Sequence, residues 1–186
     1  PDAPESSIVL IGADHGFWDV FTSAPEYVDG LPDPLDRWSS RIITALAHDV
    51  GGIALFPFGK PHLPFMTWAL RSGRAWSAPV GLLVHDRAGL MLSYRGAIAV
   101  PGLTVSRLQV EKPCDTCEAK PCLTACPPRA MTGDGYDIPT CHAFLDTARG
   151  EACLSGGCLV RRSCPAGAGY DRLPEQSAFH MRQFHP

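Results

Sequence analysis

Residues 114–127 read Cys114-Asp-Thr-Cys117-Glu-Ala-Lys-Pro-Cys122-Leu-Thr-Ala-Cys126-Pro127, a C-x2-C-x4-C-x3-C-P run. A second, looser set follows and also ends in Cys-Pro: Cys141, Cys153, Cys158 and Cys164-Pro165. These are the only eight cysteines in the 186-residue chain, so the first 113 residues contain none. So abrupt a change in composition indicates that sulfur chemistry organises the C-terminal third.

The first set is spaced much like a known cluster-binding run. In bacterial two-cluster ferredoxins, C-x2-C-x2-C-x3-C-P supplies three thiolates to one 4Fe-4S cluster, and its fourth cysteine crosses to the other. Here two extra residues precede Cys122. The second set has wider gaps, but two cubane clusters need eight thiolates and the chain has eight. The count therefore favours two 4Fe-4S clusters.

Three other interpretations of the cysteines stay open. A disulfide framework requires an oxidising compartment and is typical of small chains that cannot build a core, whereas here a long cysteine-free segment comes first. Two structural zinc sites would also use eight thiolates, but zinc ribbons favour paired C-x2-C knuckles, and only Cys114 and Cys117 form one. Free cysteines acting as small buried hydrophobic residues are rare at this density.

The composition describes an ordinary globular chain. Hydrophobic residues make up 45%, and the formal net charge is −3 with no basic or acidic block, so the charge predicts no nucleic-acid binding. No apolar run is long enough to predict a membrane span. The N-terminal residues 1–7 lack the basic and apolar regions of a secretory signal. Because metal-binding thiolates need reducing conditions, we expect a cytoplasmic protein.

The first 110 residues predict a small mixed α/β layer. Residues 7–12 and 53–58 are apolar runs typical of strands, and residues 80–94 predict a hairpin turning at Asp86–Gly89, with a strand resuming at 97–100. Asp33 is expected to cap a helix that starts at Pro34 and ends before Gly51, and a second helix is expected at 65–72. Residues 13–32 predict a long loop with a helical turn near 16–21.

The cysteine-rich part offers fewer local signals. A helix is expected from Pro139 to near Gly150, and residues 133–135 predict a turn. Gly156-Gly157 fits either a turn or a close backbone approach to inorganic sulfide. Five basic side chains are candidates to offset the negative charge of clusters: Lys112, Lys120, Arg129, Arg161 and Arg162. The order of the tail, residues 171–186, is left open.

The block from Cys114 through Cys141-His-Ala-Phe-Leu to Cys164-Pro165 resembles the ferredoxin-like part of epoxyqueuosine reductases, and more distantly that of reductive dehalogenases. In those families it follows a cobalamin-binding, nitroreductase-like α/β domain, and residues 80–97 are similar to the hairpin before the cluster domain. The resemblance implies an α+β chain in three parts. These are a nitroreductase-like layer (1–110), a ferredoxin-like domain with two 4Fe-4S clusters (111–170) and a tail (171–186).

The resemblance also implies which cysteines act together. One cluster would be held by Cys114, Cys117, Cys122 and Cys164, and the other by Cys126, Cys141, Cys153 and Cys158. The last cysteine of each sequence set thus crosses to the other cluster. Folding of this part would then depend on the clusters.

One departure from those reductases bears on function. They carry an acidic proton donor on the strand before the proline-rich helix, but this chain has Leu55-Phe56-Pro57-Phe58-Gly59 there. We therefore expect an iron-sulfur electron-transfer protein that serves a redox partner protein or a small-molecule substrate. The alternatives are a cobalamin- or flavin-dependent reductase whose clusters feed the cofactor, and a zinc-stabilised binding module. No catalytic residue is predicted.

Overall fold

A computed structural model describes residues 6–14, 16–106 and 110–186, so the predicted absence of a signal in residues 1–7 lies largely outside the described residues. The chain divides into two compact units, described separately below. The first comprises residues 6–73 and 93–106, and the second comprises residues 74–92 and 110–186, position 15 apart. Residues 74–92 thus belong to the same unit as all eight cysteines, although the sequence places them in the N-terminal part.

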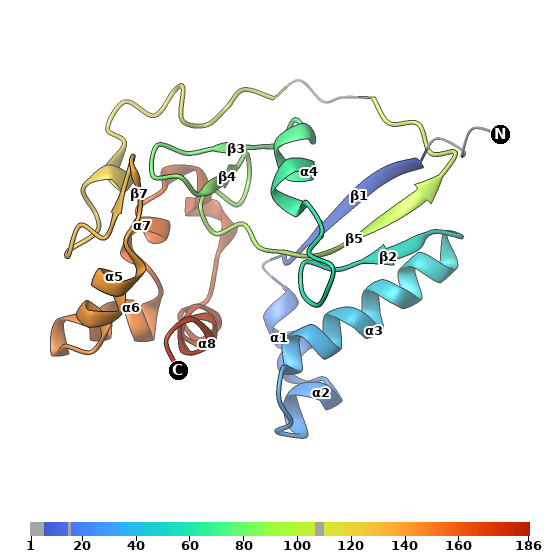
Figure 1. Cartoon of the computed structure of the whole chain (residues 1–186), viewed down its shortest axis with the longest axis horizontal. Helices are drawn as coiled ribbons and strands as arrows, with labels where there is room; N and C mark the ends of the chain where they lie inside the picture. The colour runs from blue at the N-terminus through green and yellow to red at the C-terminus, as the bar shows by residue number, and fades with distance from the viewer. Residues whose placement is uncertain (1–5, 15, 107–109) are drawn as a thin grey trace. The chain divides into compact units, whose positions relative to one another are not determined.

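The first unit is built on a three-stranded antiparallel sheet in the order β1-β5-β2 (Figure 1). The strands are β1 (Ser6–Gly12), β2 (Ile53–Leu55) and β5 (Tyr94–Pro101). Central β5 pairs along its length with β1, and its Ala97–Ala99 part also pairs with β2. Helix α3 (Pro34–Asp49) packs on β5 and β2, where Ile43 and Ala47 form a core with Ile98. The expected mixed α/β layer is confirmed.

An aromatic cluster fills the other end of this unit. Helices α1 (Phe17–Thr22) and α2 (Pro25–Val28) replace most of the predicted loop, and their rings pack with one from α3, mostly tilted or edge to face, at centroid distances of 5.1–6.2 Å. The cluster consists of Phe17, Trp18, Phe21, Tyr27 and Trp38. Helix α1 matches the helical turn predicted near residues 16–21, whereas α2 was not predicted, because four residues are too few to show a 3.6-residue period. Helix α4 (Phe65–Arg71) matches its predicted range to within one residue.

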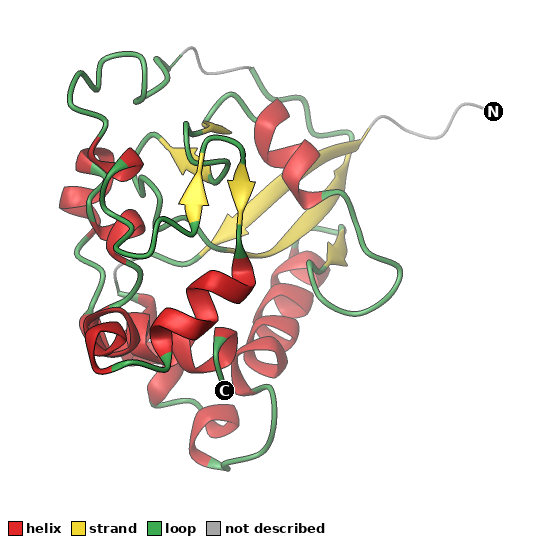
Figure 2. Cartoon of the chain, turned by 60° about the vertical axis from the view of Figure 1, so that its left-hand side comes forward, coloured by secondary structure: helices red, strands yellow, loops and turns green. Residues whose placement is uncertain are grey.

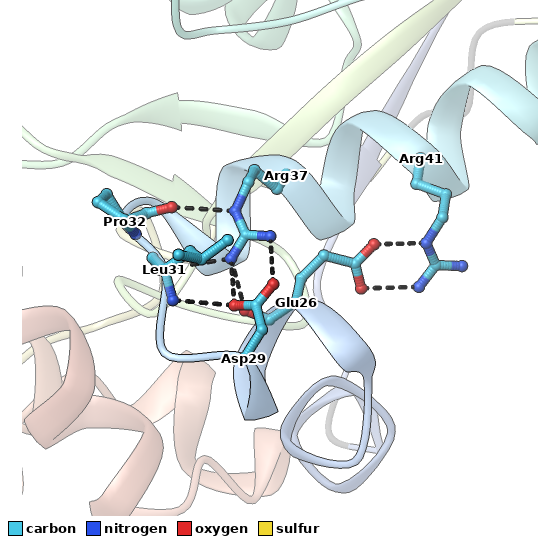
Figure 3. A network of polar contacts seen from close by, with 6 residues as sticks. All are labelled: Glu26, Asp29, Leu31, Pro32, Arg37 and Arg41. Carbon is cyan, nitrogen blue, oxygen red and sulfur yellow. Dashed lines mark hydrogen bonds and ion pairs between the residues drawn. The ribbon is translucent and has the colours of Figure 1, made fainter.

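Two arginines of α3 hold α2 in place (Figure 3). Arg41 binds both carboxylate oxygens of Glu26, at 2.5 and 2.9 Å, and Arg37 binds both oxygens of Asp29 at 2.7 and 2.8 Å. Asp33 is the N-cap of α3 and Pro34 starts the helix, as predicted, but the side chain of Asp33 does not make the capping bond. Asp33 has a left-handed backbone (φ 52°) and makes no side-chain cap bond, so its backbone carbonyl alone receives the first helical N–H groups, from Asp36 and Arg37.

The second unit consists of short helices and long loops with two small sheets (Figure 2). Its strands are β3 (Ala75–Ser77), β4 (Leu83–His85), β6 (Met131–Thr132) and β7 (Gly135–Tyr136). Its helical elements are η1 (Pro121–Leu123), α5 (Ile138–Leu145), η2 (Ala148–Gly150), α6 (Glu151–Gly156), α7 (Leu159–Arg162), η3 (Pro165–Tyr170) and α8 (Pro174–Phe184). The predicted turn at 133–135 joins β6 to β7, and the tail forms α8 with Phe179 buried.

The predicted hairpin at 80–94 was wrong in its pairing. Strand β4 pairs antiparallel with β3, which precedes it in the sequence, with Ala75 opposite His85. On the other side of the turn, a single β-bridge joins His85 to Gly89. Leu90, which the pattern placed on a second strand, is instead buried in the core at 1% exposure. The helix expected up to Gly150 ends at Leu145 and resumes as η2. Among the described residues, no helix has the length and apolarity that crossing a membrane requires.

Candidate metal centre

The eight cysteines lie within short helical elements of the second unit or in the loops beside them. Cys114 and Cys117 lie in the loop before η1, Cys122 lies within η1, and Cys126 follows it. Cys141 is in α5 and Cys153 is in α6. Cys158 and Cys164 are the residues that precede α7 and η3. All eight are free thiols, so the structure contains no disulfide among them.

Four of the cysteines line one cavity of about 220 Å³. They are Cys114, Cys117, Cys122 and Cys164, the members of the first predicted cluster site. Cys164 comes from the far end of the second sequence set, so the fold brings it to the first set as the crossed assignment requires. Apolar side chains form much of the remaining wall, including Ala78, Pro79, Val84 and Leu90.

The packing behind this cavity explains why Cys164 can reach it. Val160 of α7 is buried in a core with Cys122 of η1, and this contact brings the two sequence sets together. At Gly89, an added Cβ would lie 2.5 Å from the backbone N of Gly167 and 3.0 Å from the Cys164 Sγ. The turn after β4 therefore fits closely against the start of η3.

Burial raises the pKa values of two thiols that line this cavity. Burial raises the pKa of the Cys114 thiol, Lys112 opposes this, and the nearby Cys122, Cys164 and Cys117 add to it. Burial also raises the pKa of Cys122, and the charges of Cys164 and Cys117 raise it further. Backbone N–H groups of Cys122 and Leu123 lower it. The sulfur atoms are thus close enough to repel one another as thiolates, and a cation among them would relieve that repulsion.

The other four cysteines also influence one another. Burial raises the pKa of Cys153, and the thiols of Cys158, Cys141 and Cys126 raise it further, against a hydrogen bond from the Leu159 backbone. Burial raises the pKa of Cys141 as well; Tyr136 lowers it, and Cys158 and Cys126 raise it. Cys114, Cys117, Cys122 and Cys164 are not among the causes of these shifts. Cys126, Cys141, Cys153 and Cys158 are thus electrostatic neighbours in the fold.

Polar side chains approach the second group. The Tyr136 hydroxyl donates a hydrogen bond to the Cys141 Sγ at 3.2 Å. Arg161, between Cys158 and Cys164 in the sequence, donates to the Leu90 carbonyl at 2.6 Å, and Arg172 donates to the Met91 carbonyl at 3.3 Å. Burial lowers the pKa of Arg172 to about 10, partly opposed by Tyr170 and reinforced by Arg161.

Four thiolates can serve a zinc ion or a four-iron cluster. Within the described ranges, no three His, Cys, Asp or Glu side chains are grouped closely enough to hold one metal ion. A tetrahedral zinc site with Zn–S bonds of about 2.3 Å would need its sulfurs about 3.8 Å apart. A four-iron cluster takes one thiolate on each iron, so its ligands surround a cage. Four cysteines around one cavity fit that second arrangement.

Comparisons with protein-family models, with curated proteins and with solved structures found no match to this chain. The resemblance to epoxyqueuosine reductases therefore stays a prediction. The interpretation of the site depends on the chain's own residues and on their placement in the second unit.

Sequence reasoning missed two features of this site. It placed Gly89 in a turn without its contact to Cys164, and it did not single out Tyr136. Tyr136 stands beside a predicted turn and has no local signal for a sulfur contact. Of the basic candidates, Arg161 donates to the Leu90 carbonyl, Arg162 donates to the Ala152 carbonyl next to Cys153 at 3.5 Å, and Lys120 lines the cavity of the first group.

Proposed function

We propose that the second unit binds two 4Fe-4S clusters and transfers single electrons. Cys114, Cys117, Cys122 and Cys164 would hold one cluster, and Cys126, Cys141, Cys153 and Cys158 the other. The proposal includes the family resemblance, in which a nitroreductase-like layer precedes a ferredoxin-like domain. Such clusters, when bound, supply one-electron reduction and oxidation at low potential.

One observation carries this proposal: Cys164 lines the same cavity as Cys114, Cys117 and Cys122. A ferredoxin-type arrangement requires this crossing, because the last cysteine of each run belongs to the other cluster. Two separate zinc knuckles would instead keep neighbours in sequence together. The electrostatic contacts among the other four cysteines support it independently of the cavity.

The chain's own residues would perform three tasks. The apolar wall that includes Val84 and Leu90 would keep water from the first group. Backbone N–H groups at Cys122, Leu123 and Leu159 would stabilise negative charge on sulfur. Electron transfer forms and breaks no covalent bond, so a rigid ligand set with small reorganisation is what the fold has to provide.

The test is EPR spectroscopy of anaerobically purified full chain after reduction with dithionite. Two one-electron sites should give about two unpaired spins per chain, with spectra typical of reduced 4Fe-4S clusters. A matched sample substituted at Cys117 and Cys153 with serine should lose both signals. A colourless, EPR-silent protein that binds two zinc ions would reject the proposal in favour of a zinc-stabilised module. Corrinoid or flavin absorbance that survives gel filtration would add a cofactor to the first unit.

A further inference from the structure

We propose that Tyr136 and Arg161 make the second cysteine group (Cys126, Cys141, Cys153 and Cys158) easier to reduce than the first. The two groups would then differ in reduction potential and define a direction for an electron. This inference rests on the proposed function, since it concerns ligands that would hold clusters. Its observations are a hydrogen bond to sulfur, a half-buried cation and the apolar wall of the other group.

The hydroxyl of Tyr136 is aimed at a ligand sulfur. It donates to the Cys141 Sγ at 3.2 Å, within the range for bonds to sulfur. Reduction adds negative charge to the cluster and its sulfurs, so a donor that points at sulfur stabilises the reduced state more than the oxidised state. A hydrogen bond of this kind raises the reduction potential.

Tyr136 is held in this position from two sides. Its backbone pairs with Met131 in the β6–β7 sheet, and its ring stacks on Phe184 of α8, with centroids 6.0 Å apart and planes 15° apart. Because sheet and helix fix the ring, the hydroxyl needs little reorganisation when the charge on Cys141 changes. The C-terminal helix is therefore part of the environment of this group.

Arg161 adds a positive charge to the same group. Its half-buried guanidinium donates to the Leu90 carbonyl at 2.6 Å, and the thiol of Cys158 and the hydroxyl of Tyr136 act on its charge. In the described part of the chain no carboxylate forms an ion pair with it. A half-buried cation without a counter-charge is unfavourable, and the negative charge of a thiolate group would balance it. The added electron would strengthen that balance.

The first group receives backbone N–H groups of Cys122 and Leu123 and the charge of Lys112, but among the described residues no side-chain hydroxyl donates to one of its sulfurs. The cavity that contains Cys114 and Cys164 has an apolar wall, and the Thr116 hydroxyl that lines it donates to the Pro113 carbonyl instead of to sulfur. An apolar environment disfavours additional charge and so lowers the potential. The expected order is therefore a lower potential at the first group and a higher one at the second.

The test is a redox titration of the cluster-loaded full chain, followed by EPR, with iron and sulfide assayed on every sample. The wild type should show two midpoints. Tyr136→Phe keeps the ring stack and removes the donor. It should lower the higher midpoint potential by about 59 mV, which is a tenfold change in the equilibrium constant for one electron. Arg161→Gln should also lower this midpoint potential. Arg161→Lys keeps the positive charge, so its midpoint potential should stay close to the wild-type value.

Arg149→Gln is the charge control, because it removes the same charge from an exposed position of the second unit, where solvent screens it. It should leave both midpoints within error. If Tyr136→Phe retains its iron but moves neither midpoint, or moves the lower one, this inference is wrong and the proposed function stands. If the wild type binds no iron and sulfide, both fall.

Discussion

Gly89 and Cys164 lie so close together that a Cβ added at position 89 would be 3.0 Å from the Cys164 Sγ. Gly89 also has a left-handed backbone, with φ +52°. The turn after β4 and the start of η3 therefore fit together only when residue 89 has no side chain. This contact places a segment without cysteines against Cys164, a proposed cluster ligand.

Gly89→Ala should destabilise the second unit and loosen the first cysteine group. The new methyl would meet backbone atoms of Gly167 at 2.5 and 2.8 Å, which cannot move as a flexible side chain can. Overpacking of this kind typically costs about 1–3 kcal/mol, to which the left-handed backbone adds. Denaturant unfolding of anaerobic protein, followed by cluster absorbance, measures the effect.

Gly81→Ala is the control for this substitution. Gly81 has a similar backbone, with φ +75°, but an added Cβ would meet nothing within 4 Å. It should therefore show only the left-handed strain, about 1 kcal/mol. Equal losses in the two variants would show that the fit against Cys164 contributes nothing.

Crossed ligation gives a second prediction. Cys164→Ala should damage the group of Cys114, although Cys164 ends the second sequence set, because its sulfur lines the first cavity. Cys126→Ala should damage the group of Cys141 and Cys153, although Cys126 ends the first sequence set, because the charge of its thiol acts on both of these cysteines. EPR of partially reconstituted variants identifies the signal lost. A pattern in which each substitution affects only its neighbours in sequence would contradict the assignment.

Helix α5 should depend on its N-cap for holding Cys141. The Asp137 carboxylate accepts from the Thr140 backbone N–H at 3.0 Å and from the Thr140 hydroxyl at 2.7 Å. Asp137→Ala removes both bonds and should lower the thermal stability of the second group, whereas Asp137→Asn retains an acceptor and should lose much less. Thermal loss of cluster absorbance compares the two variants, and equal melting temperatures would refute a capping role.

The ion pairs of α2 predict the acid stability of the first unit. The Arg41 guanidinium lowers the pKa of Glu26 from its ordinary value of 4.5 to about 2, and Arg37 lowers that of Asp29. A carboxyl whose pKa falls on folding stabilises the fold above its unfolded pKa and loses this effect as pH falls through the folded pKa. The contribution of Glu26 should therefore be complete above pH 4.5 and disappear toward pH 2.

Glu26→Gln tests this window. At pH 7 it should be less stable than the wild type, and the difference should shrink between pH 4.5 and 2. Tryptophan fluorescence suits the measurement because Trp18 and Trp38 belong to the aromatic cluster beside α2. A difference that stays constant over this range would mean that the ion pair does not control acid stability.

The sequence predicted elements with strong local signals. Strand β1 follows from the β-branched run at residues 7–12, and α3 follows from Pro34 and the periodic apolar residues up to Gly51. The pairing of β3 with β4 could not be predicted in this way. It depends on Val84 and Leu90 being buried in one core with Cys122 and Val160, and such contacts between distant residues leave no local pattern.

The grouping of the cysteines was predictable only through the resemblance to a crossed two-cluster run. Spacing alone placed Cys164 with Cys158, whereas the structure places its sulfur in a cavity with Cys114. The contact of Tyr136 with Cys141 depends on the β6–β7 turn and on Phe184, which come from different parts of the sequence. Contacts between a cysteine and residues from other parts of the sequence arise from tertiary packing, so the cysteine motif does not predict them.

The most direct measurement is the iron and acid-labile sulfide content of the chain purified without oxygen. Two 4Fe-4S clusters require about eight iron and about eight sulfide per chain. The claim that the eight cysteines bind iron and sulfide would be contradicted by zinc in place of iron or by iron without sulfide. Disulfide bonds among the cysteines of anaerobically purified protein would contradict it as well.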